Sequence, residues 1–151
     1  MPKITPFLWF DTQAEEAMNF YASTFKRSKV LSMNRAQGRV MSVTFELEGQ
    51  QFMALNAGPQ FRFTEAVSFF GGCETQQEID DLWDKLTADG GAPSRCGWLK
   101  DKFGLSWQIV PNTLGRMPGD QDPQKSKRVL DAMLQMEKLD ANVLQRAYDG
   151  N

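Results

Sequence analysis

The stretch that decides the fold is ITPFLWFDTQAEEAMNFYASTF, residues 4–25. It opens with Ile4–Phe10, an apolar run rich in β-forming residues, which predicts a short buried strand. Thr12 and Glu15 then have the spacing of a capping box, in which both side chains satisfy free amide groups at a helix start. The apolar residues that follow are spaced for one face of a helix, namely Ala14, Ala17, Met18, Tyr21 and Phe25. The stretch therefore predicts a strand followed by an amphipathic helix.

Three more strands are expected after this helix. Their signals are alternating or apolar runs at Lys29–Arg35, Arg39–Leu47 and Gln51–Ala57. Turns between them are indicated by Gln37-Gly38 and Glu48-Gly49. Together with the first strand and helix they form a βαβββ module.

The same order then begins again. Glu65–Cys73 is typical of a strand, and Thr75 with Glu78 forms a second predicted capping box. A second helical stripe follows, made of Ile79, Leu82, Trp83 and Leu86. The two threonines are 75 − 12 = 63 positions apart, and the same shift places Ile4–Phe10 on Val67–Cys73. We interpret this as a duplicated module.

A hairpin of Arg95–Lys100 and Leu105–Pro111 is expected to complete the second module, with a weak strand signal around Ala92–Arg95. Residues 112–121 are interpreted as a connection. Asp122 and Asp140 are then predicted to cap two helices of a tail. We therefore expect an α+β fold of two tandem βαβββ modules forming a curled mixed sheet, plus C-terminal helices. The chain is treated as a single domain, with module one at about 1–62, module two at about 63–111 and the helical tail at about 112–151.

Composition excludes several classes of function. The 151 residues carry a net charge of −2, which argues against nucleic acid or a membrane surface as partner. The chain has no histidine, which removes Ser-His and Cys-His nucleophiles and every histidine-based metal site. The two cysteines, Cys73 and Cys96, are expected to be reduced, so the cytoplasm is the expected location.

A phosphate-binding loop is not indicated, because Gly71-Gly72 lacks the spacing of nucleotide-binding glycines. Aromatic residues are dense instead, and Phe7 and Trp9 share one face of the first strand. Most of the aromatic side chains must build the core, while some are expected to line a cavity together with nearby polar groups. The predicted ligand-binding residues are Phe7, Trp9, Asn56, Gln60, Phe61, Ser68, Phe70, Trp98, Trp107 and Gln108.

Three segments, Ile4–Phe25, Phe45–Phe69 and Cys96–Pro111, together resemble the PhnB-like branch of the vicinal oxygen chelate superfamily. That superfamily includes glyoxalases, bleomycin-resistance proteins and extradiol dioxygenases. The pattern of Asp, Phe-Gly and Trp across Lys100–Trp107 is part of the match. The resemblance implies two βαβββ modules curled around a cavity, and commonly a homodimer. Proteins of this branch are often labelled 3-demethylubiquinone methyltransferase-like, although nothing in the chain resembles an S-adenosylmethionine loop.

In metal-dependent relatives, the resemblance places the ligand positions near Pro6, Asn56, Glu65 or Ala66, and Gln108. Related sequences often carry histidine where Gln60 stands. Only Glu65 among these offers an anionic ligand, and one carboxylate with amides is weak for a transition metal. We therefore expect no metal and no cofactor.

The first functional hypothesis is a protein that binds a small molecule in an aromatic-lined cavity as a homodimer, with no catalytic residue assigned. The first alternative is a metal-dependent isomerase, lyase or dioxygenase. A second alternative is the methyltransferase activity that the family label suggests. A third is a cofactor-free enzyme that uses Glu65, Tyr21 or Lys100 as acid or base.

Overall fold

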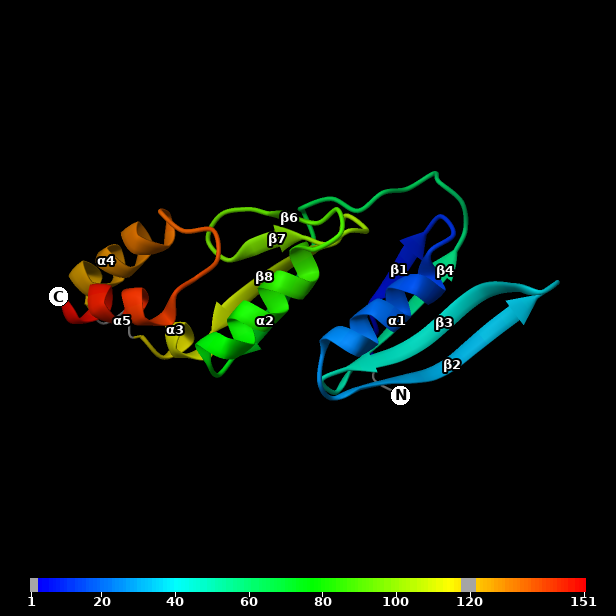
Figure 1. Ribbon diagram of the computed structural model, residues 1–151, viewed down its shortest axis with the longest axis horizontal. Helices are drawn as coiled ribbons and strands as arrows, with labels where there is room; N and C mark the ends of the chain where they lie inside the picture. The colour runs from blue at the N-terminus through cyan, green and yellow to red at the C-terminus, as the bar shows by residue number, and fades with distance from the viewer. Residues whose placement is uncertain (1–2, 118–121) are drawn as a thin grey trace. The chain divides into compact units, whose positions relative to one another are not determined.

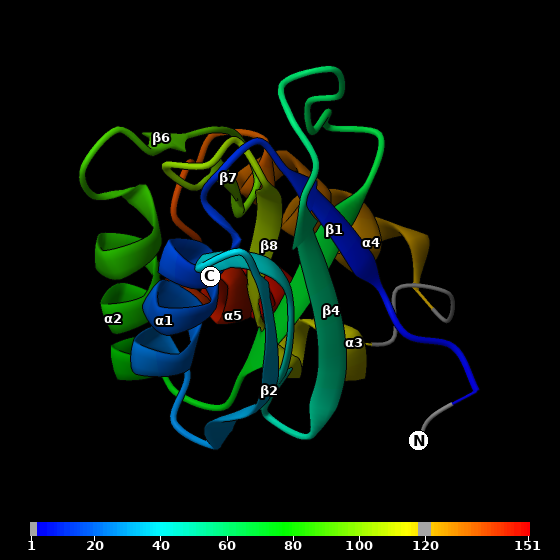
Figure 2. The same cartoon turned by 90° about the vertical axis from the view of Figure 1, so that its right-hand side faces the viewer.

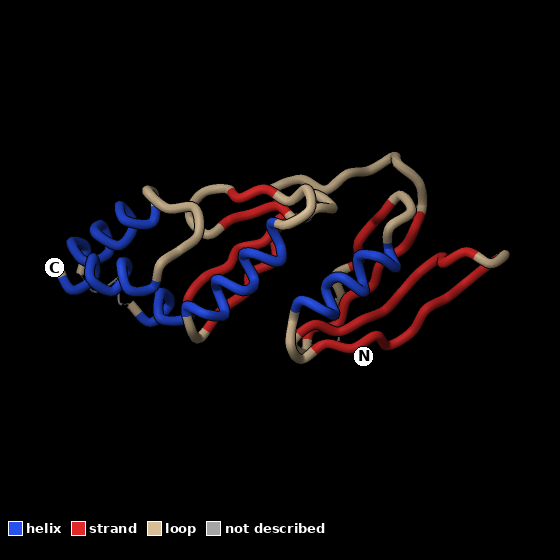
Figure 3. The backbone as a smooth tube through the Cα atoms, in the orientation of Figure 1, coloured by secondary structure: helices blue, strands red, loops and turns tan. Residues whose placement is uncertain are grey.

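The computed structural model describes residues 3–117 and 122–151. The chain divides into two compact units, Met1–Arg62 and Phe63–Asn151, whose elements are labelled in Figure 1. Figure 3 shows by colour that a strand, a helix and further strands follow one another in each unit, and that helices end the chain. Each unit is described by itself.

The first unit is one βαβββ module. Its elements are β1 (Phe7–Phe10), α1 (Ala14–Thr24), β2 (Ser28–Ala36), β3 (Arg39–Leu47) and β4 (Gln50–Asn56). The sheet order is β1-β4-β3-β2, in which β1 runs parallel to β4 and the other pairs are antiparallel. Figure 2 shows β1 and β4 side by side. The face under α1 is the core, where Tyr21 stacks on Phe45 and Phe45 on Phe52.

The second unit repeats this plan. Its module consists of β5 (Ser68–Cys73), α2 (Gln76–Thr87), β6 (Ala92–Pro93), β7 (Trp98–Lys100) and β8 (Ser106–Pro111). The sheet order is β5-β8-β7-β6, and β5 runs parallel to β8. A shift of 63 moves α1 to 14 + 63 = 77 and 24 + 63 = 87, which matches α2 within one residue. The predicted α+β fold with two βαβββ modules is confirmed.

One of the two predicted capping boxes is wrong. The N-cap of α1 is Gln13, and no side chain of its own start caps this helix. Instead, Asn56 accepts a hydrogen bond from the amide of Ala14 at 2.8 Å. The threonine half of the second box is confirmed, since Thr75 accepts from the amide of Glu78 at 3.1 Å and is the N-cap of α2. Glu78 accepts from the amide of Glu74, one residue before the N-cap, at 2.9 Å. The cap of α1 therefore comes from the neighbouring strand, which the local sequence does not reveal.

The tail forms three helices, α3 (Asn112–Arg116), α4 (Pro123–Met133) and α5 (Ala141–Asp149). Both predicted aspartate caps are confirmed, because Asp122 and Asp140 each accept hydrogen bonds from two amides of the following turn. The interpretation of 112–121 as a plain connection is wrong at its start, where α3 lies, and residues 118–121 lie outside the described part. The tail helices pack on Val110 of β8 and bury Val129, Leu139 and Leu144.

Within the described residues, no helix combines the length and the apolar character that crossing a lipid bilayer requires.

Candidate functional site

The second sheet has one covered face and one open face. Alternate side chains of a strand point to opposite faces, so Trp107 and Ile109 of β8 lie under α2 and are buried. Phe70 of β5 and Gln108 of β8 are direct partners in the ladder. They lie on the opposite face, where Phe70 is 65% exposed. Trp98 of β7 is the ladder partner of Gln108 on its other side, so Phe70, Gln108 and Trp98 form a row across three strands.

A pocket of about 330 Å³, here called the aromatic pocket, lies on this open face. Three of the predicted ligand-binding residues line it, namely Phe70, Trp98 and Gln108. Its remaining walls are Cys96, Val110, Pro111, Asn112, Leu114, Gly115 and Met133. Among the described residues, none that lines it has an acidic or basic side chain, so the pocket as described is an uncharged recess with an aromatic wall.

Two amide side chains are held in place at the aromatic pocket. The Nδ2 atom of Asn112 donates to Oε1 of Glu74 at 2.6 Å. The Nε2 atom of Gln108 donates to Oγ of Ser68 at 3.0 Å, which ties the predicted residue Ser68 to the same row. The Oε1 atom of Gln108 is left to accept a hydrogen bond from a ligand.

A second pocket, of about 290 Å³, shares Trp98 with the first and is lined by the ion pair of Glu65 and Lys100. The hydrogen bond from Lys100 lowers the pKa of Glu65, and this carboxylate is exposed. The Glu65 carboxylate is therefore charged near neutral pH and is paired with Lys100. Tyr21, the third residue considered as an acid or base, is buried in the core of the first unit. The three side chains do not form a common catalytic group.

In the first unit the open face of the sheet carries Phe7 and Trp9. The indole nitrogen of Trp9 donates to the carbonyl oxygen of Gly58 at 2.9 Å, and its ring meets Phe61 edge-on with centroids 4.8 Å apart. Gln60 is exposed in the loop beside Phe61. This smaller aromatic group belongs to the first unit, whereas the residues of the aromatic pocket belong to the second.

Two of the predicted ligand-binding residues lie among structural contacts instead. Asn56 accepts from Ala14, and its Nδ2 atom donates to the carbonyl oxygen of Val40 at 3.2 Å. Trp107 is 4% exposed, and its indole nitrogen donates to Oδ2 of Asp101 at 2.9 Å. The sequence shows the residue types but not that these polar atoms are used inside the fold.

Some pocket residues were not predicted from the sequence. Leu114 and Met133 come from the tail. The apolar face that includes Met133 is compatible with a partner surface or with packing on the chain's own sheet, but the sequence does not show that both residues line one pocket. Cys96 adopts a φ of +59°, which is uncommon for a residue other than glycine, and the following Gly97 also has a positive φ. These two residues turn the chain into β7, so that Cys96 reaches the pocket.

The residues at the family's metal-ligand positions do not fit a metal site. Pro6 has no side-chain atom that can ligate a metal. The side chain of Asn56 is hydrogen-bonded to two backbone groups, and Glu65 is paired with Lys100. Within residues 3–117 and 122–151, no cluster of three or more His, Cys, Asp or Glu side chains could hold an ion. A transition metal needs several strong donors together, which this arrangement does not supply.

Gly71 and Gly72 lie inside β5 and follow the regular ladder with β8. A Cβ atom at Gly72 would overlap the side-chain amide of Asn112. Gly72 is therefore explained by close packing against the start of α3, while a Cβ atom at Gly71 would approach the side chain of Ile109 in β8. The interpretation that the pair is not a phosphate loop agrees with its place inside a regular strand.

Two βαβββ modules, each with a helix on one face of a mixed sheet, define a fold of the glyoxalase and bleomycin-resistance class. The chain belongs to the PhnB-like family described as 3-demethylubiquinone-9 3-methyltransferase, whose model matches residues 2–110. A Bacillus cereus protein described by that family name and as a PhnB protein is 40% identical. The match covers 73% of this chain and 99% of that one, with a TM-score of 0.69.

Two more distant structures show the fold alone. A protein from Pseudomonas aeruginosa is 18% identical over 74% of this chain and 98% of its own, with a TM-score of 0.62. A glyoxalase/bleomycin resistance protein from Albidiferax ferrireducens is 10% identical over 74% of this chain and 99% of its own, with a TM-score of 0.52. No protein of curated function matches the chain. The family model ends at residue 110, so helices α3, α4 and α5 lie beyond it.

Proposed function

We propose that this protein binds a small, uncharged, partly aromatic molecule in the aromatic pocket. The observation that carries the proposal is the convergence of Phe70, Trp98 and Gln108 on one uncharged recess. Binding pockets for small molecules are mostly apolar, with a few polar groups that set the orientation of the ligand.

The chemistry of the walls selects the ligand class. Phe70 and Trp98 offer ring faces, which favour a flat aromatic partner. Gln108 offers a carbonyl oxygen, which favours a ligand that carries a hydroxyl or amino group. A charged group placed in a recess without an opposite charge would lose its hydration without compensation. A phenol-like molecule fits these three conditions.

We propose further that binding requires no metal and no cofactor, because the donor set described above does not suit a metal. The methyltransferase activity in the family's description has no separate support in the geometry of the pocket. The homodimer implied by the resemblance and the cytoplasmic location both stay predictions, as does the treatment of the two modules as a single domain.

Protection of Cys96 from alkylation tests the proposal. Cys96 lines the pocket and is partly accessible, whereas Cys73 is 1% exposed and serves as an internal reference. We expect 4-methylphenol to slow the alkylation of Cys96 by iodoacetamide, as measured by peptide mass spectrometry. The slowing should saturate with the concentration of 4-methylphenol.

The Phe70→Ala variant should weaken this protection by about tenfold in ligand concentration, because truncating a ring contact of this size costs about 1–2 kcal/mol. Phe70 is largely exposed, so the change should leave the fold intact. Val67→Ala is the matched control, since Val67 is 62% exposed and does not line the aromatic pocket. Equal protection in both variants, or none in the unmodified protein, would contradict the proposal.

A further inference from the structure

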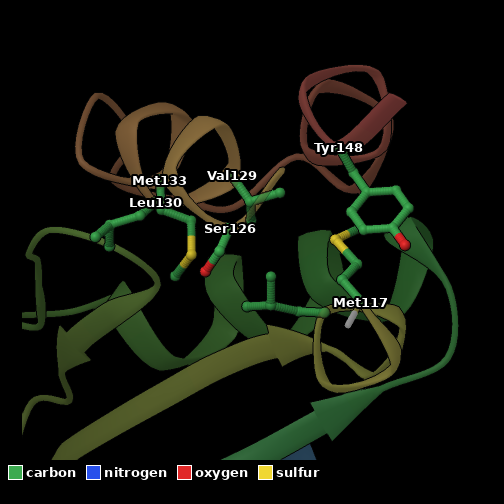
Figure 4. Close-up of a pocket in the computed structure, with 7 residues that line it drawn as sticks. Met117, Ser126, Val129, Leu130, Met133 and Tyr148 are labelled. Atoms are coloured by element: carbon green, nitrogen blue, oxygen red, sulfur yellow. The ribbon is translucent and has the colours of Figure 1, made fainter. Parts of the chain in front are cut away.

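The tail encloses an additional recess, here called the apolar pocket, with a volume of about 250 Å³. Figure 4 shows its walls. Ser126, Val129 and Met133 reach into it from α4, Tyr148 comes from α5, and Leu114 and Met117 lie at α3. Among residues 3–117 and 122–151, the residues that line this pocket have no charged side chain, and its described polar groups are the hydroxyls of Ser126 and Tyr148.

The apolar pocket and the aromatic pocket have a common wall. Leu114 and Met133 line both of them. Methionine is unbranched and has three rotatable side-chain bonds, so it adapts to different neighbours at low cost. Met133 is therefore the side chain whose rotamer would have to change for one ligand to occupy both recesses.

The segment that joins α4 to α5 is hydrogen-bonded to the βαβββ module of the second unit. The amides of Cys96 and Gly97 donate to the carbonyl oxygens of Met136 and Glu137 at 2.9 and 2.8 Å. Gln76 of α2 donates to the carbonyl oxygen of Leu139 at 3.0 Å and accepts from the amide of Ala141 at 2.8 Å. The tail is thus a fixed part of the pocket, although it lies beyond the family match.

We propose that the natural ligand is an amphiphile, with an uncharged aromatic head in the aromatic pocket and an apolar tail that passes Met133 into the apolar pocket. This inference rests on the proposed function for the head group. It adds that helices α3, α4 and α5 determine which ligands bind, because they supply the whole of the second recess. An aromatic head alone fills the first recess and leaves the second one empty.

A series of 4-alkylphenols tests the inference, with the alkyl chain lengthened from methyl to heptyl. Affinity is measured through protection of Cys96. We expect the affinity to rise by about fourfold for each methylene group, the fold-change that corresponds to about 0.8 kcal/mol of apolar burial. The rise should stop once the apolar pocket is full.

Filling the apolar pocket distinguishes this site from general hydrophobic adsorption. Ser126 is partly exposed on α4, so Ser126→Phe adds a ring to the recess with little disturbance of the core. The variant should bind 4-methylphenol like the unmodified protein but lose the gain from longer chains. Gln124→Phe is the matched control and should keep the gain, because Gln124 is exposed on α4 and lines neither pocket. Circular dichroism checks that both variants fold.

The outcomes separate the two proposals. If 4-methylphenol binds but longer chains bring no gain, or if Ser126→Phe keeps the gain, the amphiphile inference is wrong and the proposed function stands. If no member of the series protects Cys96, the proposed function fails and the inference fails with it.

Discussion

Thr75 lies at the N-cap of α2, where its hydroxyl oxygen accepts a hydrogen bond from the amide of Glu78 at 3.1 Å. Thr12 occupies the corresponding place in the first module but is exposed and does not cap α1. We expect Thr75→Ala to lower the free energy of unfolding by about 1 kcal/mol, the usual contribution of an N-cap side chain. Urea denaturation followed by tryptophan fluorescence measures the change.

Thr12→Ala provides the comparison, because it makes the same chemical change at the position related by the internal repeat. Its effect should stay within about 0.5 kcal/mol, as for ordinary surface substitutions. Equal losses in the two variants would mean that the threonine at each helix start contributes in the same way, contrary to the geometry.

At the level of single residues, the sequence indicated which residue types line the open sheet face, but it did not indicate which polar side chains form hydrogen bonds inside the fold. Phe70 and Gln108 were predicted as ligand-binding residues, and the pairing of β5 with β8 makes them direct partners on one face. Asn56 shows the limit, because its side chain caps a helix that begins 42 residues earlier in the chain. Such a bond depends on the pairing of β1 with β4, and no local pattern encodes it.

Between elements, α2 and the tail are joined by the ion pair of Asp80 and Lys138, with Nζ and Oδ1 2.9 Å apart. The hydrogen bond from Lys138, supported by one from Gln76, lowers the pKa of Asp80 below 3.8. The same hydrogen bond raises the pKa of Lys138 above 10.5. Each group is therefore held in its charged form over a wider range of pH in the folded protein than in the unfolded chain.

These directions define the pH range in which the pair stabilises the fold. The contribution of Asp80 is present above its unfolded pKa of 3.8 and is lost as the pH falls through its lowered folded pKa. The contribution of Lys138 is present below 10.5 and is lost as the pH rises through its raised folded pKa. The effect should be small, since both side chains are more than a third exposed to solvent.

We expect Asp80→Asn to lower the melting temperature slightly between these limits and to make no difference at more acidic pH. Differential scanning calorimetry from pH 3 to pH 9 measures the melting temperatures of the unmodified protein and of Asp80→Asn. Asp81→Asn is the control, because the described hydrogen bond of Asp81 is with Gln77 of the same helix. A pH-independent difference for Asp80→Asn would show that the ion pair is not its source.

At the level of elements, apolar periodicity predicted the two module helices and the long strands, since each has a clear buried face. It was less informative where elements are short. β6 consists of two residues and α3 of five, which is too few for a periodic signal. The contact of the tail with the open face of the second sheet is a tertiary feature, which is why Leu114 and Met133 were missed.

For the whole molecule, the resemblance predicts a homodimer, and the first unit bears apolar side chains that suit burial in an assembly. Those more than 40% exposed there include Phe7, Val30, Leu31 and Met41. Exposed apolar side chains that lie close together are typical of interaction surfaces. We expect light scattering coupled to size-exclusion chromatography to give about 34 kDa, twice the 17.1 kDa of one chain. A mass of 17.1 kDa at every concentration tested would refute the dimer.

The packing of Gly72 against Asn112 affects the shape of the aromatic pocket. Asn112 stays beside the strand and keeps its bond to Glu74 because β5 presents only a hydrogen atom there. One added methyl group would overlap this amide and displace it, and Asn112 lines the aromatic pocket although Gly72 does not. A substitution at Gly72 would thus change which ligands the pocket binds, although this residue lies behind the binding surface.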